Sequence, residues 1–315
     1  MRIDSVTFFT SGLVGIRDNQ SAMARLNEQI ATGQNFLAPK DDPLATQKVL
    51  DLGNRLAART QYAANQTKAD LALEYESTVL NEVESALNKA RALLVGTSPA
   101  FDAQARDAHA QQLRGVFEHL LSLANTQDPS GNYIFAGDKT TTQPFANAGG
   151  GDGGNPPAGV VTGYVGSAST REVEVDTGRR LQVSDNLDTV YRAGDGAGVD
   201  LLQTLDEAIV RLPLSNPPGA IPDQATLDGY IQTLDDAINA LAGIQYRIAG
   251  AQTELADLTA TTNSLMTLES NALGDLQQLD QAAAIMRLKT RQTSLEAAER
   301  AYAMTSSLSL FSYLG

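Results

Sequence analysis

The chain has 315 residues, of which 37 are acidic and 23 are basic, and its formal net charge is −14. A surface of this sign repels phosphate backbones and anionic lipid, which argues against nucleic-acid binding and against binding to a membrane surface. Cysteine is absent, which excludes disulfides, thiolate metal sites and cysteine nucleophiles, and only 5% of the residues are aromatic, so a core must rest mainly on aliphatic side chains.

The N-terminal segment is predicted to be a helix. It has no apolar run of signal-peptide length, and no window of the chain approaches the roughly 18 apolar residues of a membrane span. Instead, apolar residues recur at intervals of seven with companions nearby, which is the pattern of a helical stripe. The stripe consists of Phe9, Ile16, Met23 and Ile30, with Val6, Leu13 and Leu26. Gly33 follows it at the place of a left-handed C-cap.

Two carboxylates and a proline separate this helix from the next, in the stretch ATGQNFLAPKDDPLATQ (31–47). Asp41 and Asp42 are adjacent, so their side chains point apart and are not placed like a catalytic acid and base. A structural role fits better, because Asp42 can accept the free N–H groups of a helix start and Pro43 suits the first helical position. We predict that Gly33, Asp41, Asp42 and Pro43 form a helix linker and cap.

The next two segments are also predicted to be helical. One helix spans about 42–95, roughly 80 Å if continuous, and leucines recur at intervals of seven in its later half: Leu73, Leu80, Leu87 and Leu94. A third helix spans about 102–127 and contains His109 and His119. These two histidines lie on different faces about 15 Å apart and cannot share a metal, so they are predicted to be solvated.

A strand-rich insert is predicted between about 131 and 197. The run GGGDGGNPP (149–157) cannot be helical and is interpreted as a surface loop, since it lacks the pattern of a phosphate or calcium loop. Alternation places Val173, Val175, Leu181 and Val183 on matching faces, with a turn at 176–178. We expect the heptad rows to fall outside the insert, so that deleting about 146–190 leaves the helices folded.

Helix returns at 199–212 and again near 223. Because no proline follows Pro222, the last segment is predicted to form one helix of about 80 residues, on the order of 120 Å long. A helix of this length needs another long helix beside it, and the N-terminal stripe supplies one. The inner leucine and alanine rows, at about 45–95 and 225–275, fit an ordinary intramolecular core.

The predicted fold class is therefore mainly α with a β-rich insert, an elongated rod of long antiparallel helices whose terminal helices pair as a coiled coil. We divide the chain into a terminal coiled-coil assembly region (1–40 and 280–315), a helical rod domain (41–135 and 198–279) and a β-rich variable insert domain (136–197).

The two chain ends are predicted to become ordered only on assembly. The entropy lost in ordering them exceeds the return from burying their apolar side chains in a lone helix pair, so contacts with neighbouring copies must supply the rest. The predicted assembly interface consists of Phe9, Leu13, Ile16, Met23, Leu26, Ile30, Leu279, Met286, Leu288, Leu295, Tyr302, Leu308, Leu310, Phe311 and Leu314. No catalytic, metal or cofactor site is predicted, since no GxSxG elbow or HExxH motif is present.

Three stretches carry a resemblance to a known family. The segment IATGQNFLAPKDDPLATQ resembles the N-terminal signature of the bacterial flagellin superfamily. The end AAAIMRLKTRQTSLEAAERAYAMTSSLSLFSYLG and the stretch GNYIFAGDKTTTQPF (131–145) are similar to its hook–filament junction branch. The resemblance covers about 1–145 and 225–315.

This resemblance implies a structural subunit that forms a ring between the hook side and the filament of an extracellular flagellum. The implied partners are further copies of the chain, hook-associated protein 1 on the hook side, flagellin on the filament side, and a cytoplasmic export chaperone at the C-terminal helix. Export would use the flagellar type III apparatus without a cleaved signal peptide. Two alternatives stay open: the flagellin filament subunit itself, and a flagellin-embedded metalloprotease, for which the sequence lacks the motif.

Overall fold

The structure is a computed structural model of the chain, and it describes residues 2–98, 102–145, 147–148, 160–161, 164–192, 201–213 and 222–314. The glycine-rich run 149–157 lies outside these ranges. Two compact units are present: unit 1 comprises Met1–Thr60 and Ser264–Gly315, and unit 2 comprises Gln61–Asn263. The three-part division made from the sequence stays a prediction.

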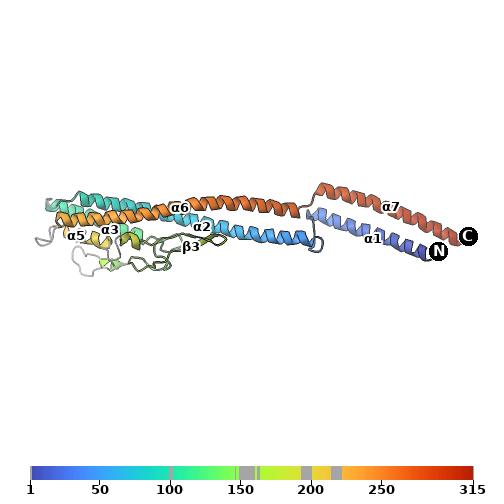
Figure 1. Cartoon of the computed structure of the whole chain (residues 1–315), viewed down its shortest axis with the longest axis horizontal. Helices are drawn as coiled ribbons and strands as arrows, with labels where there is room; N and C mark the ends of the chain where they lie inside the picture. Colours follow the sequence, from blue (N-terminus) through green and yellow to red (C-terminus); the bar gives the residue numbers. More distant parts are fainter. Residues whose placement is uncertain are drawn as a thin grey trace. The chain divides into compact units, whose positions relative to one another are not determined.

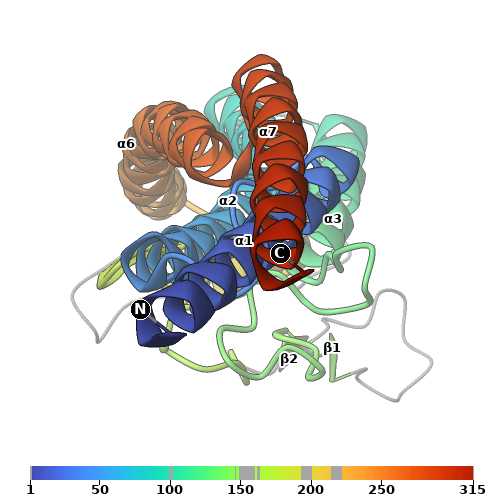
Figure 2. The same cartoon turned by 90° about the vertical axis from the view of Figure 1, so that its right-hand side faces the viewer.

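Unit 1 contains both terminal helices. The helices α1 (Arg2–Thr32) and α7 (Gln281–Leu314) lie side by side in Figures 1 and 2. The unit also contains the first part of α2 (Pro43–Val95) and the last part of α6 (Gln224–Gln277). The ion pair between Arg59 and Glu269 joins α2 to α6 here, with 2.9 Å between Nε and Oε2.

The prediction of one helix from about 223 to the chain end is wrong. Helix α6 ends at Gln277 and α7 begins at Gln281, although no glycine or proline stands between them. The intervening backbone makes hydrogen bonds with the segment after α1, and Asp280 caps the new helix: its Oδ1 accepts the N–H of Ala283 at 3.0 Å. A capped restart satisfies N–H groups that a helix start leaves free, so the break is stable without a helix breaker.

Unit 2 is organised around α2 and α6, which run antiparallel and side by side (Figure 1). Gln245 of α6 donates to Glu84 of α2 at 2.9 Å, and Arg91 pairs with Asp235. The predicted leucine row of α2 is fully buried, as is a row at intervals of seven on α6: Leu227, Leu234, Leu241, Ile248 and Leu255. Each such side chain contributes about 1.5–3 kcal/mol by leaving water.

Two further helices pack into the same core. These are α3 (Ala103–Ala124) and α5 (Leu201–Arg211), which contact each other. Asp102 caps α3 by accepting the N–H of Ala105 at 2.8 Å. The predicted third helix is therefore present with its end three residues earlier than expected.

The β insert consists of two antiparallel pairs in the described residues. One joins β1 (Asn147–Ala148) to β2 (Val160–Val161), both labelled in Figure 2, and the other joins β3 (Glu172–Asp176) to β4 (Arg179–Gln182). Gly178, at φ 68°, makes the predicted turn. The fold class is confirmed as mainly α with a small β insert. Helices make up most of the described residues, and the strands there are few and short.

The heptad rows lie outside the insert, but the insert still contributes to the helical core, which argues against the prediction that deleting about 146–190 leaves the helices folded. Val175, Leu187 and Val190 are fully buried and belong to the same hydrophobic cluster as the leucines of α2. Gln66 of α2 also donates to the carbonyl oxygen of Val175 at 2.8 Å. The short helix α4 (Asp188–Tyr191) inserts Tyr191, whose ring meets Phe145 with 5.1 Å between centroids. The insert therefore supplies one side of the core of unit 2.

Within the described ranges, no helix has an apolar stretch long enough to cross a bilayer.

Candidate assembly site

The terminal helices contact each other along one antiparallel seam in unit 1. A Cβ atom at Gly12 of α1 would lie 3.4 Å from Cδ2 of Tyr302 of α7, so this ring packs on the α1 backbone. Further along, Arg291 Nη1 donates to Asn19 Oδ1 at 3.0 Å. Residue numbers therefore rise on α1 as they fall on α7, which is the antiparallel arrangement.

The predicted interface residues are only half-covered by this pairing. The side chain of Leu13 is 41% exposed and that of Met286 is 68% exposed. The other predicted residues whose side chains are described are intermediate in burial: Ile16, Met23, Leu26, Ile30, Leu279, Leu288, Leu295 and Tyr302. The side chains of Phe9, Leu308, Leu310, Phe311 and Leu314 lie outside the described residues. A two-helix pair leaves much of each apolar stripe in water, as expected for helices that lack further neighbours.

Exposed apolar side chains are concentrated in unit 1. Of the twelve large hydrophobic residues that are exposed in the described structure, eight belong to this smaller unit. They are Leu13, Val14, Leu44, Leu50, Leu268, Ile285, Met286 and Met304. Six of these eight were missed by the sequence analysis, because they stand outside the heptad rows that were used to find the interface.

The segments that follow α1 and α6 are joined by backbone hydrogen bonds. The N–H of Asn35 donates to the carbonyl oxygen of Gln277 at 2.8 Å, and the N–H of Leu279 donates to that of Gly33 at 2.9 Å. Gln34 and Gln278 form the isolated antiparallel bridge between them. Gly33, at φ 70°, ends α1 in the left-handed conformation, where its lack of a Cβ removes the usual strain. We call this arrangement, residues 33–35 with 277–279, the linker bridge.

The two aspartates of the linker have different roles. Asp42 Oδ1 accepts the N–H of Ala45 at 2.9 Å at the start of α2, and Pro43 is the first helical residue. Asp41 instead accepts the N–H of Ala38 at 3.1 Å and pairs with Arg25 of α1, with 3.1 Å between Oδ1 and Nη2. Asp42 therefore caps α2, while Asp41 braces the turn against α1.

A buried polar cluster in unit 2 fastens the insert to the long helices. Glu76 of α2 accepts the N–H of Asp185 at 2.7 Å, and the carboxylate of Asp185 pairs with Arg247 of α6 and with Gln182. Burial, with the nearby negative charge of Asp185, raises the pKa of Glu76 to about 7. Burial also raises the pKa of Asp185, against the lowering effect of Arg247.

The histidines do not form a site. His119 is exposed as predicted, but the prediction of solvation is wrong for His109, which is half-buried. Its Nδ1 lies 2.9 Å from Oγ1 of Thr97, and because that hydroxyl donates to the carbonyl oxygen of Leu93, the ring N–H is the donor. In the part of the chain that the structure describes, no group of three or more candidate ligands could hold a metal ion.

Known proteins similar to this chain come from the bacterial flagellum. Residues 11–140 match the bacterial flagellin N-terminal helical region. The flagellar hook-associated protein 3 of Escherichia coli K12 is 26% identical over 325 residues, and that of Salmonella typhimurium is 28% identical over 317 residues. Both alignments cover 99% of this chain and 99% of the relative.

Two solved structures share the fold. A putative flagellar hook-associated protein from Vibrio parahaemolyticus superposes with a TM-score of 0.66 at 22% identity, over 76% of this chain and all of the other. The flagellar junction protein from Legionella pneumophila gives a TM-score of 0.56 at 16% identity, over 73% of this chain and 99% of the other. The resemblance to the flagellin superfamily, and within it to the hook–filament junction branch, is confirmed by these matches.

Proposed function

We propose that this chain, which resembles flagellar hook-associated protein 3 along its whole length, is a structural subunit of the bacterial flagellum and forms the junction between the hook side and the flagellin filament. The end-to-end similarity to two proteins of that name is the observation that supports this proposal most strongly. Similarity confined to the terminal helices would fit any member of the superfamily, whereas these alignments include the insert as well.

Assembly of the junction uses further copies of the chain, arranged in a ring. The apolar side chains that α1 and α7 leave half-covered supply the contact surface, together with Leu44, Leu50 and Leu268. Burying such side chains between copies is favourable by about 1.5–3 kcal/mol each at full burial. The terminal assembly region, 1–40 and 280–315, thus joins one copy to the next together with the neighbouring parts of α2 and α6 in unit 1.

The other partners are hook-associated protein 1 on the hook side, flagellin on the filament side, and a cytoplasmic export chaperone that covers α7 before assembly. The relatives are flagellar components, which supports an extracellular location on the flagellum. Export through the flagellar type III apparatus is part of the same proposal. The role is structural and requires no cofactor, in keeping with the structural flagellar relatives.

Immunogold electron microscopy of intact flagella tests the proposal. We expect label confined to the boundary between hook and filament, and purified protein that does not extend into long filaments. Label along the whole filament, or long filaments of the purified protein, would identify a filament subunit instead. A flagellum without label would remove the flagellar role altogether.

A further inference from the structure

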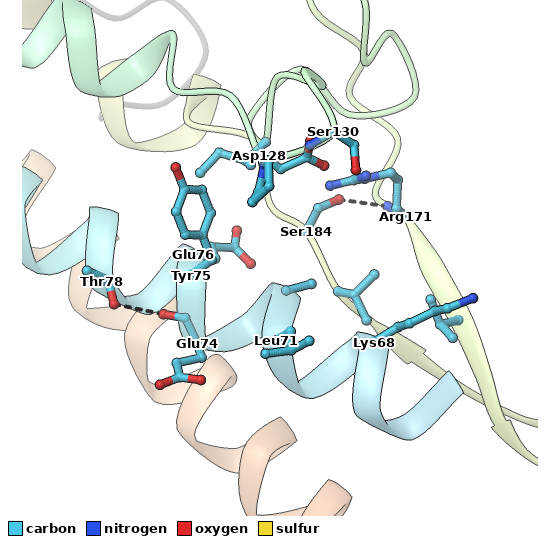
Figure 3. A pocket seen from close by; sticks show the side chains of 15 residues that line it. Lys68, Leu71, Glu74, Tyr75, Glu76, Thr78, Asp128, Ser130, Arg171 and Ser184 are labelled. Carbon is cyan, nitrogen blue, oxygen red and sulfur yellow. Dashed lines mark hydrogen bonds between the residues drawn. The ribbon is translucent and has the colours of Figure 1, made fainter. Parts of the chain in front are cut away.

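Every methionine of the chain belongs to unit 1, although unit 2 is the larger of the two units. The methionines are Met1, Met23, Met266, Met286 and Met304. In unit 2, by contrast, a hollow of about 710 Å³ on the surface is lined by Leu71, Ile134 and Val173 and by no methionine (Figure 3). Because cysteine is absent, these five side chains hold the only sulfur atoms of the protein. Sulfur chemistry is therefore confined to the unit that the proposed function assigns to assembly.

Two of the methionines lie on one exposed face of α7. The 18 residues from Met286 to Met304 make five turns of helix, about 27 Å along the axis, so the two side chains leave the helix in the same direction. They are 68% and 69% exposed. Leu288, Leu295 and Tyr302 stand about half a turn away, and the ring of Tyr302 packs on the backbone of α1. The two methionines therefore point away from α1.

The other described methionines are better covered. Met23 of α1 and Met266 of α6 are both intermediate in burial, and Met266 lines a hollow together with Leu56 of α2. Oxidation of a sulfur atom depends on its access to the oxidant, so the two sulfurs on the exposed face of α7 react first.

Hydrogen peroxide oxidises a methionine thioether in a two-electron step. The sulfur lone pair attacks one oxygen of the peroxide, an S–O bond forms, and the O–O bond breaks. The hydroxide that leaves takes the proton from the transferred oxygen and becomes water, so sulfur is oxidised and peroxide is reduced. The product, methionine sulfoxide, is polar where the thioether was apolar. Burying its oxygen between two copies without a hydrogen-bond donor is unfavourable.

We propose that Met286 and Met304 are an oxidation site of the free subunit, at which peroxide makes the outer face of α7 polar and so prevents the subunit from joining its neighbours. This inference rests on the proposed function, because it takes the same face of α7 to be buried in the assembled ring.

Oxidation rates at the separate methionines test the site. The purified full-length chain and isolated flagella are treated with hydrogen peroxide, and mass spectrometry of peptides gives the sulfoxide fraction at each position with time. In the free chain we expect Met286 and Met304 to react several-fold faster than Met23 and Met266, with no change in the melting temperature, since the new oxygens remain in water. In flagella the same two residues should react several-fold more slowly than in the free chain. Equal rates at all four positions of the free chain, or equal rates in the free chain and in flagella, would overturn the proposal.

Cells grown with sublethal hydrogen peroxide test the effect on assembly. The quantity measured is the share of exported chain that is found in the medium instead of on flagella, with each strain compared to itself without peroxide. We expect this share to rise several-fold for the natural chain and to stay unchanged for M286L/M304L, which has no sulfur on this face. Adding L71M to M286L/M304L is the matched control. Leu71 is 60% exposed at the hollow of unit 2 (Figure 3), so the added sulfur is oxidised outside the assembly surface, and the share should again stay unchanged.

The outcomes separate this inference from the proposed function. If immunogold labelling does not find the chain on flagella, the proposed function fails. If the chain is present at the boundary between hook and filament, but the natural form and M286L/M304L respond alike to peroxide, only the oxidation site is overturned. A peroxide response that L71M restores would also overturn it, because the position of the sulfur would then be irrelevant.

Discussion

The backbone N–H of Leu279 donates to the carbonyl oxygen of Gly33 across 2.9 Å, and so ties the end of α1 to the restart of the chain at α7. The adjacent bond from Asn35 to Gln277 makes this a pair of antiparallel contacts. Both segments have left their helices at the same level, so each supplies partners for backbone groups that a helix end leaves free. The linker bridge therefore explains why α6 and α7 are two helices in the absence of a helix breaker.

Replacing Gly33 by alanine should destabilise the linker bridge by about 1 kcal/mol. The cost is conformational, because φ is 70° and a Cβ at this position would meet no atom within 4 Å. We expect faster amide exchange at Asn35 and Leu279, with a lower urea midpoint of the transition that reports on unit 1.

Gly53→Ala is the matched control for that change. Gly53 lies within α2, and a Cβ there would also meet nothing within 4 Å, but its φ is helical. Alanine should therefore stabilise the protein by roughly 0.5–1 kcal/mol at this site. A Gly33→Ala variant as stable as Gly53→Ala would contradict the account of the linker bridge.

The cap of α2 should depend on an oxygen at position 42 and not on its charge. Asp42→Ala should lose about 1 kcal/mol of local stability, because the N–H of Ala45 loses its acceptor, while Asp42→Asn keeps one and should change little. Amide exchange across 44–47 measures this. If both variants exchanged equally fast, the negative charge would be the stabilising feature and the capping account would be wrong.

Several features of the fold could be predicted from the sequence because they depend on local interactions. The cap at Asp42, the glycine at the end of α1, the hairpin turn at 176–178 and the buried leucine row of α2 each follow from a few neighbouring residues. The break between α6 and α7 could not be found in this way, since its cause is backbone pairing with a segment more than 240 residues away. One local signal was available. Aspartate is a preferred N-cap residue, and Asp280 directly precedes the first residue of α7, where its side chain accepts the N–H of Ala283.

The candidate sites show the same contrast between features set by neighbouring residues and features set by long-range contacts. The exposed residues Val14, Ile285 and Met304 are apolar but stand outside the heptad rows, so only their positions in space mark them as surface. The buried polar cluster of unit 2 needs Glu76, Asp185 and Arg247 from segments far apart in the chain, and no spacing in the sequence connects them. Long-range packing, which decides both, is not encoded in any short window.

The core contribution of the insert can be tested at Leu187. This side chain is 0% exposed, so Leu187→Ala should lower the free energy of unfolding of unit 2 by about 2–5 kcal/mol. Val165→Ala, which truncates an exposed side chain of the same insert, should change it by less than about 0.5 kcal/mol. Urea unfolding followed by circular dichroism compares the two. A Leu187→Ala variant with unchanged helix stability would restore the view that the insert is dispensable.

Glu76 should make the stability of unit 2 depend on pH. Its folded pKa of about 7 lies above the ordinary value of 4.5, so the folded state holds a proton that the unfolded state releases between these values. The free energy of unfolding should therefore fall as pH rises from about 4.5 to 7, by up to about 3 kcal/mol for a shift of this size. Asp185, whose pKa is also raised, acts in the same direction.

Glu76→Gln removes the titration while keeping an oxygen for the N–H of Asp185. We expect this variant to lose most of the pH dependence between about pH 5 and pH 8 and to exceed the natural protein in stability at the upper end. Glu74→Gln, at an exposed position two residues earlier on α2, is the control and should follow the natural protein. Melting curves of all three across this range decide the matter, and parallel pH profiles would refute the role of Glu76.

The assembly role of the terminal helices can be tested at Met286, which lies on α7 and is 68% exposed. In the free subunit, Met286→Asp should leave the melting temperature unchanged, because a charge at this position remains in water. In the proposed ring the same carboxylate would be buried against another copy without a partner, which costs several kcal/mol per subunit and is repeated around the ring.

Met286→Leu keeps an apolar side chain and should assemble normally. We therefore expect cells with Met286→Asp to export a folded subunit but to shed flagellin, and cells with Met286→Leu to swim. Filaments of normal length on cells with Met286→Asp would show that this face of α7 stays in solvent, and the interface would have to be sought on the opposite face.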